Sequence, residues 1–319
     1  MNKGEFELID FIRKQFNAPE GVTGIGDDCA VMPQTSGDET LVSTDLLIEG
    51  VHFLLTGVHP IDPYSLGWKS AAVNISDIAA MGGVPTGSFL SLAIPKTLSD
   101  TFLEEFFKGY KDLSDKFDCP LLGGDTTSST GKLCISVTVT GKCVQGRALK
   151  RSAALEGDLI CVTGPLGDSA AGLHAILHNL PRTEITDYLI DKHFRPMPRV
   201  DAGLVLTEHH RTGIGAAMDI SDGIGSDIRH IMEESGVGVE IDLNSIPLSR
   251  ELQRFCSRLD LDPRDFAADG GEDYELLFTV DPAAEASLNV QRSAIGRVTD
   301  TGRLEWKGTD KDYKGFRHF

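Results

Sequence analysis

Acidic clusters set among small or apolar residues constrain this chain more than any other feature. One of them is Ser43-Thr44-Asp45, where the apolar residues Leu41 and Val42 indicate the end of a β-strand and the aspartate is expected to follow in a loop. No lysine or arginine lies within several residues of Asp45. Four other clusters share this composition, and they are Gly26-Asp27-Asp28, Ile75-Ser76-Asp77, Gly123-Gly124-Asp125 and Met218-Asp219-Ile220-Ser221-Asp222.

Carboxylates that lie close together without a basic partner are unfavourable, through repulsion and loss of hydration, unless a cation compensates them. Aspartate and glycine also mark turns, and a turn explains any single cluster about as well. It does not explain why Asp77 interrupts an Ala/Ile-rich helical segment, or why Asp125 and Asp219 follow apolar residues at expected strand ends. The set as a whole therefore indicates a shared cation site.

The residue types in these clusters indicate which cation is bound. Carboxylates with Ser or Thr hydroxyls, and without His or Cys, favour hard cations that bind oxygen. The acids are not gathered in one short loop, as the ligands of an EF-hand are. Acids dispersed over several segments are typical of sites where Mg²⁺ bridges nucleotide phosphates. The sequence therefore predicts several Mg²⁺ ions and a bound nucleotide.

Length and charge exclude several classes of protein. A chain of 319 residues, 40% of them hydrophobic, is long enough for two domains with a core each. A formal net charge of −18 argues against a nucleic-acid-binding surface, which needs Lys and Arg on one face. No window approaches the roughly 20 apolar residues of a membrane span, and the first residues lack the pattern of a targeting peptide. We therefore expect a cytoplasmic protein that binds neither nucleic acid nor membrane and keeps its six cysteines reduced.

Hydrophobic periodicity and capping residues predict helices and strands in both halves of the chain. The clearest helix covers 62–81, where Asp62-Pro63 begins it and Gly82-Gly83 ends it. A basic interruption near 146–152 is the expected boundary between domains 1–146 and 147–319. Further helices are expected over 4–16, 99–117, 170–177, 201–209 and a segment ending at Gly236, and strands over 89–95, 121–122, 133–141, 159–163 and 237–243.

The common phosphate-binding and nucleophile motifs are absent. Gly24-Ile25-Gly26 is followed by Asp27-Asp28, whereas a dinucleotide-binding loop needs a helix N-terminus there. The sequence lacks both the P-loop motif and the catalytic motifs of protein kinases. No Ser, Cys or His belongs to a recognisable nucleophile motif with a base and an orienting group. We therefore expect phosphate to be bound by a less common fold and transferred without a covalent intermediate.

Six ordered motifs carry a resemblance to a known family. They are Gly24-Ile25-Gly26-Asp27-Asp28, Ser43-Thr44-Asp45 with Gly50-Val51-His52-Phe53, Asn74-Ile75-Ser76-Asp77-Ile78-Ala79-Ala80-Met81-Gly82, Gly123-Gly124-Asp125-Thr126-Thr127, Asp219-Ile220-Ser221-Asp222-Gly223 and Gly270-Gly271-Glu272-Asp273-Tyr274-Glu275-Leu276. Together they resemble the thiamine-monophosphate kinases from about residue 4 to the C-terminus. Single motifs are shared with other ATP-using enzymes, including aminoimidazole ribonucleotide synthetase, selenophosphate synthetase and the carbamoyl dehydratase of hydrogenase maturation.

The resemblance implies an α/β protein of two α+β domains with a fold like that of aminoimidazole ribonucleotide synthetase. The N-terminal domain, 1–146, would bind ATP and metal and form a dimeric β-barrel with the same domain of a partner chain. The C-terminal domain, 147–319, would complete the cleft for nucleotide and substrate. The implied reaction is Mg²⁺-dependent, in-line transfer of a phosphoryl group from ATP to thiamine monophosphate, which a homodimer would use to make thiamine diphosphate.

The same resemblance implies roles for individual residues. The metal ligands would be Asp28, Ser43, Thr44, Asp45, Asp77, Asp125, Asp219 and Asp222, with the share of Asp27 left open. ATP would contact Gly124, Asp125, Arg151 and Ser221, and thiamine monophosphate would contact His52, Glu272 and Phe316. An acid and an aromatic ring suit the cationic thiazolium of this substrate. His52 could instead be a structural histidine, and Arg151 a solvated charge in the linker.

Two alternatives stay open at this point. One is another enzyme of the same ATP-using group with a different acceptor, although no reactive cysteine precedes Cys29, as a selenophosphate synthetase requires, and the chain ends in His318-Phe319, without the cysteine tail of the dehydratase. The other is a non-catalytic protein that binds divalent cations. Hydrolysis of ATP that depends on an added phosphomonoester would distinguish an enzyme from such a protein.

Overall fold

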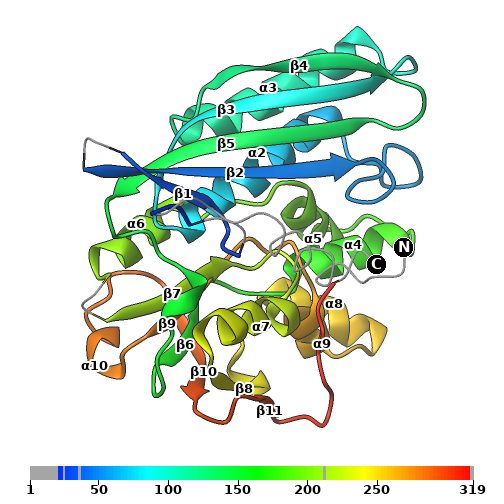
Figure 1. Cartoon of the computed structure of the whole chain (residues 1–319). Coiled ribbons are helices and arrows are strands. Elements are labelled where there is room, and N and C mark those ends of the chain that lie inside the picture. Colours follow the sequence, from blue (N-terminus) through cyan, green and yellow to red (C-terminus); the bar gives the residue numbers. More distant parts are fainter. Residues whose placement is uncertain (1–20, 24–25, 35–36, 211–212, 317–319) are drawn as a thin grey trace, which may run out of the picture.

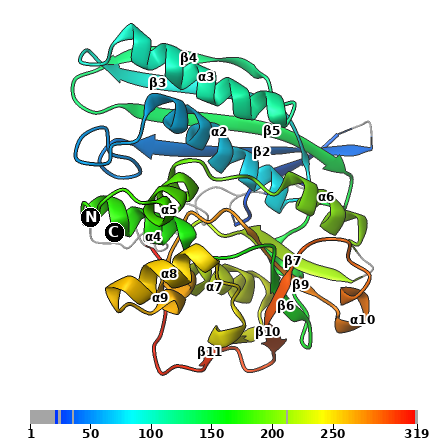
Figure 2. The same cartoon turned by 180° about the vertical axis from the view of Figure 1, so that it is seen from behind.

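Two mixed β-sheets, each with its own helices, make up the computed structural model of the chain (Figures 1 and 2). The structure describes residues 21–23, 26–34, 37–210 and 213–316. The helix expected over 4–16 lies outside the described residues, as do Gly24 and Ile25. No helix within the described ranges is long and apolar enough to cross a membrane.

The first sheet has five strands in the order β1-β2-β5-β3-β4. Neighbouring strands are antiparallel, except that β3 and β4 are parallel. Helices α2 and α3 cover one face, and no helix of the described ranges covers the other (Figures 1 and 2). The bounds are Ala30–Pro33 for β1, Asp38–Ile48 for β2, Pro63–Ala80 for α2, Val84–Pro95 for β3, Asp100–Lys116 for α3, Leu121–Ser129 for β4 and Cys134–Val144 for β5.

Helix α2 is buried along most of its length. Asp62 caps its N-terminus by accepting a 2.9 Å hydrogen bond from the N–H of Ser65, and Pro63 occupies the first turn. A Cβ at Gly67 would overlap the carbonyl oxygen of Phe106 in α3, so a glycine here lets the two helices approach closely. Another side of α2 contacts β7 and α6 in the second half of the chain. This helix can therefore supply side chains to a site between the halves.

The second sheet has six strands in the order β11-β8-β10-β6-β9-β7, and all neighbours are antiparallel except β11 and β8. Buried apolar residues run continuously from the first sheet through α2 to β7 and β9, so the halves share one core. The strand bounds are Leu159–Val162 for β6, Ile214–Asp219 for β7, Gly238–Asp242 for β8, Leu276–Val280 for β9, Ser293–Thr299 for β10 and Leu304–Lys307 for β11.

The helices of the second half lie around this sheet, and α4, α5 and α8 share a smaller apolar core of their own. The short helices Arg151–Ala153 and Leu243–Ser245 are of the 3-10 type. The α-helix bounds are Asp168–Leu177 for α4, Glu184–Phe194 for α5, Val200–Glu208 for α6, Ile224–Ser235 for α7, Arg250–Leu259 for α8, Pro263–Asp269 for α9 and Pro282–Glu285 for α10.

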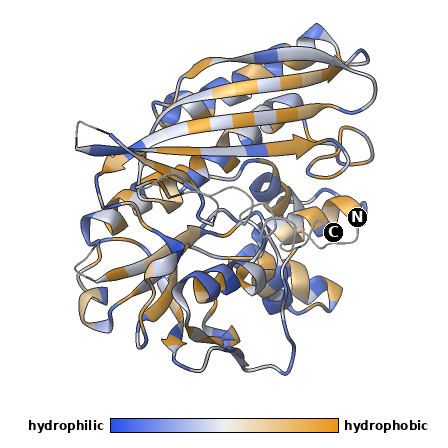
Figure 3. Cartoon of the chain, viewed as in Figure 1, coloured by the Kyte–Doolittle hydropathy of each residue, from blue (hydrophilic) through white to orange (hydrophobic). Residues whose placement is uncertain are grey.

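Two expectations about strands are wrong. Asp45 does not follow β2 but lies inside it, because β2 pairs with β5 as far as Ile48. Asp125 likewise lies within β4 and does not follow a two-residue strand. Successive side chains of a strand point to opposite faces, so a strand can carry a polar side chain toward a site without ending. Figure 3 shows this alternation of apolar and polar residues along β3 and β5.

The other expected elements within the described residues are confirmed to within a few residues, apart from β3, which begins at Val84 and not near Phe89. They are α2, α3, α4, α6, α7, β5, β6 and β8. The expectations omit α5, α8 and α9. Their N-caps, Thr183, Ser249 and Asp262, are signals that the sequence does contain.

Candidate functional site

A cavity of about 860 Å³ is lined by both halves of the chain. The first half contributes the end of β2, the loop that follows it and α2, and the second half contributes α4, α5 and three loops. These loops contain residues 221–222, 270–272 and 315–316, and Asp269 at the end of α9 also lines the cavity. The walls carry acidic residues and also apolar ones such as Leu54 and Leu173, so the cavity suits a ligand with both charged and apolar parts.

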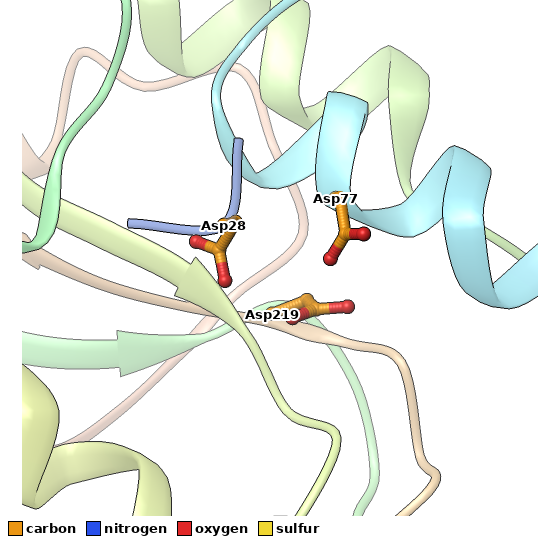
Figure 4. A group of neighbouring side chains, drawn as sticks. All are labelled: Asp28, Asp77 and Asp219. Carbon is orange, nitrogen blue, oxygen red and sulfur yellow. The ribbon is translucent and has the colours of Figure 1, made fainter. Parts of the chain in front are cut away.

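Three carboxylates from distant parts of the sequence meet beside this cavity (Figure 4). Asp28 comes from the segment before β1, Asp77 from α2 and Asp219 from the end of β7. One oxygen of each carboxylate lies within 4.8 Å of the corresponding oxygens of the other two. This spacing allows all three to bind the same cation or neighbouring cations.

Two serine hydroxyls hold the carboxylates of this acid cluster. Ser43 Oγ on β2 donates a 2.5 Å hydrogen bond to Asp77 Oδ2, and Ser76 Oγ on α2 donates a 2.5 Å hydrogen bond to Asp219 Oδ2. Asp28 Oδ2, by contrast, is buried without a hydrogen-bond partner among the described residues. A buried carboxylate oxygen without a donor is unfavourable, so this atom fits a metal ligand.

The raised pKa values of Asp77 and Asp219 in the acid cluster and of Asp45, which lies close enough to act on them, also indicate that a cation binds here. Burial, reinforced by the charge of Asp28, raises the pKa of Asp45 to about 6 and that of Asp219 to about 8. Burial and the charges of Asp45 and Asp219 raise the pKa of Asp77 well above its ordinary value. A divalent cation counters both causes, because it neutralises repulsion and replaces lost hydration. The donors are carboxylates and hydroxyls, which are ligands that Mg²⁺ prefers, so these residues fit that ion.

Arg151 is joined to the acid cluster and is not a solvated linker charge. Its guanidinium Nη2 donates a 2.5 Å hydrogen bond to Asp28 Oδ1, and the two side chains are only 17% and 2% exposed. The backbone N–H of Arg151 donates a 2.8 Å hydrogen bond to Asp27 Oδ1. Burial nevertheless raises the pKa of Asp27 to about 6. Asp28 therefore belongs to the acid cluster and pairs with the side chain of Arg151, whereas Asp27 holds the backbone of Arg151.

Glu272 lines another wall of the cavity, where two buried bases hold it. Lys69 Nζ on α2 donates a 2.9 Å hydrogen bond to Glu272 Oε2, and His193 Nδ1 on α5 lies 3.1 Å from the same oxygen. Burial raises the pKa of Glu272, but the charges of its basic neighbours, Lys69 first, and the hydrogen bond from Lys69 together outweigh burial, so the net pKa is lowered. Burial and Lys69 lower the pKa of His193 to about 3. At neutral pH, Glu272 is therefore ionised and His193 is uncharged.

The backbone before Glu272 is fixed by close contact with the loop after β7. Glu272 has a left-handed φ of +63°, which is unusual for a residue with a side chain. Its N–H donates a 2.7 Å hydrogen bond to the carbonyl oxygen of Ser221. A Cβ at Gly271 would overlap that same oxygen, so a glycine is required there. These contacts set Glu272 and Ser221 on adjoining walls.

Four other predicted site residues also line the cavity, namely Thr44, His52, Asp222 and Phe316. The N–H of Ile48 donates a 2.9 Å hydrogen bond to His52 Nδ1, so this ring is anchored by its own loop. The N–H of Phe316 donates a 2.9 Å hydrogen bond to the carbonyl oxygen of Asp222, and the Phe316 side chain is half exposed. The cavity thus has an aromatic ring at its rim.

Gly124 and Asp125 are not brought to the acid cluster. Both lie on β4, an exposed edge strand that β5 and β3 separate from Asp45 on β2. Three strand spacings amount to about 14 Å. Gly124 has a φ of +149°, and a Cβ there would overlap the carbonyl oxygen of Leu90, so glycine is required for pairing with β3. Asp125 Oδ1 accepts a 2.9 Å hydrogen bond from the N–H of Thr126.

Sequence reasoning missed Lys69, His193 and Asp227. Lys69 has a usable signal, since it is the one basic residue of helix α2. His193 has none, because only the packing of α5 brings it to Glu272. Asp227 is buried in the first turn of α7, where its Oδ2 accepts hydrogen bonds from the N–H groups of Asp222 and Gly223 and shapes the loop after β7.

Comparison with protein families agrees with this two-part architecture. Residues 26–143 match the family described as "AIR synthase related protein, N-terminal domain". Residues 156–307 match "AIR synthase related protein, C-terminal domain". Fold and site thus define a member of the AIR synthase related proteins.

Full-length relatives narrow this class. The thiamine-monophosphate kinase of Aquifex aeolicus is 37% identical over 99% of this chain and 98% of its own length. That of Salmonella typhimurium is 41% identical with the same two coverages. The solved structure "AaThiL complexed with AMPPCP and TMP" has a TM-score of 0.89 at 37% identity and covers 99% of this chain and 97% of that chain. The chain belongs to the thiamine-monophosphate kinase family and is a phosphotransferase whose acceptor is a phosphate group.

Proposed function

We propose that this chain transfers the γ-phosphoryl group of ATP to thiamine monophosphate in one Mg²⁺-dependent displacement and so forms thiamine diphosphate. The observation that carries the proposal is the cluster of Asp28, Asp77 and Asp219 beside a cavity of about 860 Å³. The related structure with AMPPCP and TMP supports the pairing of an ATP analogue with this acceptor. The cavity volume falls in the usual range for small ligands, roughly 300–1,000 Å³.

Mg²⁺ ions would be held by oxygen atoms of the acid cluster and its neighbours. When bound, they supply positive charge that offsets the repulsion between two phosphate-bearing ligands and the charge of the transferred group. The proposed ligands are Asp28, Ser43, Thr44, Asp45, Asp77, Asp219 and Asp222. Asp125, which the resemblance also implies as a ligand, lies on β4 and is separated from the others by two strands of the same chain.

The nucleotide would contact Arg151 and Ser221, with Gly124 and Asp125 contributed by β4. Arg151 suits a phosphate because its Nε is buried without a partner among the described residues, so the guanidinium keeps a donor after it pairs with Asp28. The acceptor would contact His52, Glu272 and Phe316. These assignments put the nucleotide phosphates at the acid cluster and the acceptor in the rest of the cavity.

The chain's own contribution to the reaction is positioning and charge. The acceptor phosphate oxygen is anionic at neutral pH, so it needs no strong general base to attack. His52 is the residue to consider as a covalent relay, but its Nδ1 accepts the N–H of Ile48, which suits a role in orienting a phosphate. We propose that no phosphoenzyme forms.

We also propose a homodimer through the first sheet of the N-terminal domain, 1–146. No helix of the described ranges covers the outer face of this sheet, and Leu46 on β2, Phe89 on β3 and Leu122 on β4 are 53%, 42% and 59% exposed. Exposed apolar side chains gathered on one sheet suit a protein interface. A second copy would bury them, close a β-barrel and cover the edge of β4 that carries Asp125.

The activity is tested by incubating the chain with ATP, Mg²⁺ and thiamine monophosphate and resolving the products by chromatography. We expect one thiamine diphosphate for each ATP consumed, and no product when unphosphorylated thiamine replaces the acceptor. Saturable Mg²⁺ binding without turnover would favour the non-catalytic alternative.

The mechanism is tested with labelled ATP. Without acceptor, γ-labelled ATP should leave the protein unlabelled, and a chiral γ-phosphoryl group should reach the product with inverted configuration. Retention of configuration, or a phosphohistidine that reacts on to product, would show two displacements.

The homodimer is tested by light scattering. The wild type should have the mass of two chains, and Leu122→Asp should have the mass of one.

A further inference from the structure

Lys69 is a buried charge to which the proposed function gives no role. Its side chain is 1% exposed, and its ammonium group bonds Glu272 Oε2 at 2.9 Å. Burying an ion pair is rarely a gain in stability, since well-packed apolar residues often serve as well or better. The pair spans the two halves, because Lys69 lies on α2 and Glu272 lies just before β9. These facts indicate that Lys69 serves Glu272, and not only the fold.

His193 holds the same carboxylate oxygen. Its Nδ1 lies 3.1 Å from Glu272 Oε2 and 3.0 Å from Ser169 Oγ. The hydrogen bond of Nδ1 is the one with Ser169, and it fixes the uncharged ring against the carboxylate of Glu272. Oε2 thus accepts a hydrogen bond from the buried Lys69 and lies against the buried ring of His193. A ligand in the cavity would meet the other oxygen, Oε1, on a side chain that is still 25% exposed.

The backbone of Glu272 is held as firmly as its carboxylate. Its φ of +63° is unfavourable for a residue with a side chain and persists only where surrounding contacts enforce it. Here this conformation is enforced by the hydrogen bond from its N–H to the carbonyl oxygen of Ser221 and by the close approach of Gly271 to the same oxygen. A carboxylate fixed at both ends presents one oxygen in one direction, which suits a directional hydrogen bond.

We propose that Lys69 and His193 are positioning residues that hold the carboxylate of Glu272 in place and neutralise its charge. Glu272 then selects thiamine monophosphate by accepting a hydrogen bond from an N–H group of this substrate, and not by attracting its positive charge. This inference rests on the proposed function. In thiamine monophosphate the N–H donors belong to the amino group of the pyrimidine ring, and the positive charge belongs to the thiazolium. Because Lys69 balances the charge of Glu272, little net charge remains to attract the thiazolium.

Two substrate analogues distinguish recognition of the amino group from recognition of the positive charge in the wild-type enzyme. One monophosphate carries an oxo group in place of the pyrimidine amino group and keeps the thiazolium. The other keeps the amino group and carries an uncharged triazole ring in place of the thiazolium. We expect kcat/KM with ATP to fall roughly 10- to 100-fold for the first and less than about 5-fold for the second.

Equal losses, or the reverse order, would overturn the inference while leaving the proposed function intact. If thiamine monophosphate itself is not turned over, the proposed function fails and the inference fails with it. These results need no variant, so they stand even if a substitution at Lys69 prevents folding.

A double-mutant cycle tests whether Lys69 acts through Glu272. Lys69→Met and Glu272→Gln should each raise KM for thiamine monophosphate about 10-fold and change KM for ATP less than about twofold. The double variant should be no worse than either single variant, because both remove the same contact. Lys108→Met, which removes an exposed lysine on α3, is the matched control and should change neither constant. Multiplied effects in the double variant, or equal effects on both substrates, would overturn the role of Lys69.

Discussion

Ser76 on α2 donates a 2.5 Å hydrogen bond to Asp219 at the end of β7, and this bond joins the two halves of the chain at the acid cluster. The next residue, Asp77, accepts a hydrogen bond from Ser43 on β2. Two consecutive residues of α2 therefore take part in the cluster: Ser76 orients Asp219 of the second half, and Asp77 is an acid of the first half. The geometry of the cluster therefore depends on how α2 packs against β7.

Ser76→Ala should lower activity with little change in fold. Loss of the hydroxyl frees the carboxylate of Asp219 to rotate, so we expect kcat to fall about 10-fold and the Mg²⁺ concentration for half-maximal rate to rise. Ser70→Ala is the control, because Ser70 is also buried in α2 but bonds the carbonyl oxygen of Leu66 in its own helix. Steady-state rates over a Mg²⁺ titration give the answer, and equal losses in both variants would contradict this role of Ser76.

The metal-free chain should lose stability as the pH rises from about 6.5 to 8.5. Burial raises the pKa of Asp219 to about 8, so above its ordinary pKa the folded chain keeps a proton that the unfolded chain has released. Unfolding free energy then falls with pH, by about 2 kcal/mol over this window. The buried His193, whose pKa is lowered to about 3, destabilises the fold only at lower pH.

Urea unfolding in the presence of a chelator measures this effect. Asp219→Asn should remove part of the pH dependence, because the raised pKa of Asp77 acts in the same direction, and added Mg²⁺ should stabilise the wild type more at pH 8.5 than at pH 6.5. A free energy of unfolding that rises across this window would contradict the assignment.

Arg151→Met should impair both stability and the use of ATP. It leaves the buried carboxylate of Asp28 without its partner, which should lower the free energy of unfolding by about 2–4 kcal/mol in the absence of metal. Adding Asp28→Asn should restore part of this stability and none of the activity. Arg264→Met, which breaks a more exposed ion pair with Asp262, is the control and should leave KM for ATP unchanged. Unchanged KM for ATP in Arg151→Met would count against a phosphate contact.

Gly271→Ala should displace Glu272. A Cβ at this position overlaps the carbonyl oxygen of Ser221, so we expect a loss of about 1–3 kcal/mol in unfolding free energy and a higher KM for thiamine monophosphate. Gly131→Ala is the control, since nothing lies within 4 Å of a Cβ there. Thermal unfolding and steady-state kinetics of both variants check this, and similar behaviour of the two would show that the Gly271 contact is not needed.

Much of the local structure could be predicted from the sequence. The bounds of α2 follow from the cap at Asp62-Pro63 and the stop at Gly82, because capping and helical periodicity act over a few residues. The residue types of the acid clusters also indicate a cation that prefers oxygen, since ligand preference depends on donor chemistry and not on fold. The family resemblance likewise rests on ordered motifs, and the full-length relatives confirm it.

Which residues meet, however, was decided by the tertiary structure. The acids lack basic neighbours in sequence, yet Arg151 reaches Asp28 across 123 residues and Lys69 reaches Glu272 across 203. Asp45 was expected in a loop because the sequence does not show that β5 pairs with β2 through that position. Strand pairing, burial and the pKa shifts that burial causes arise from contacts between distant segments, and a local pattern of residues does not contain them.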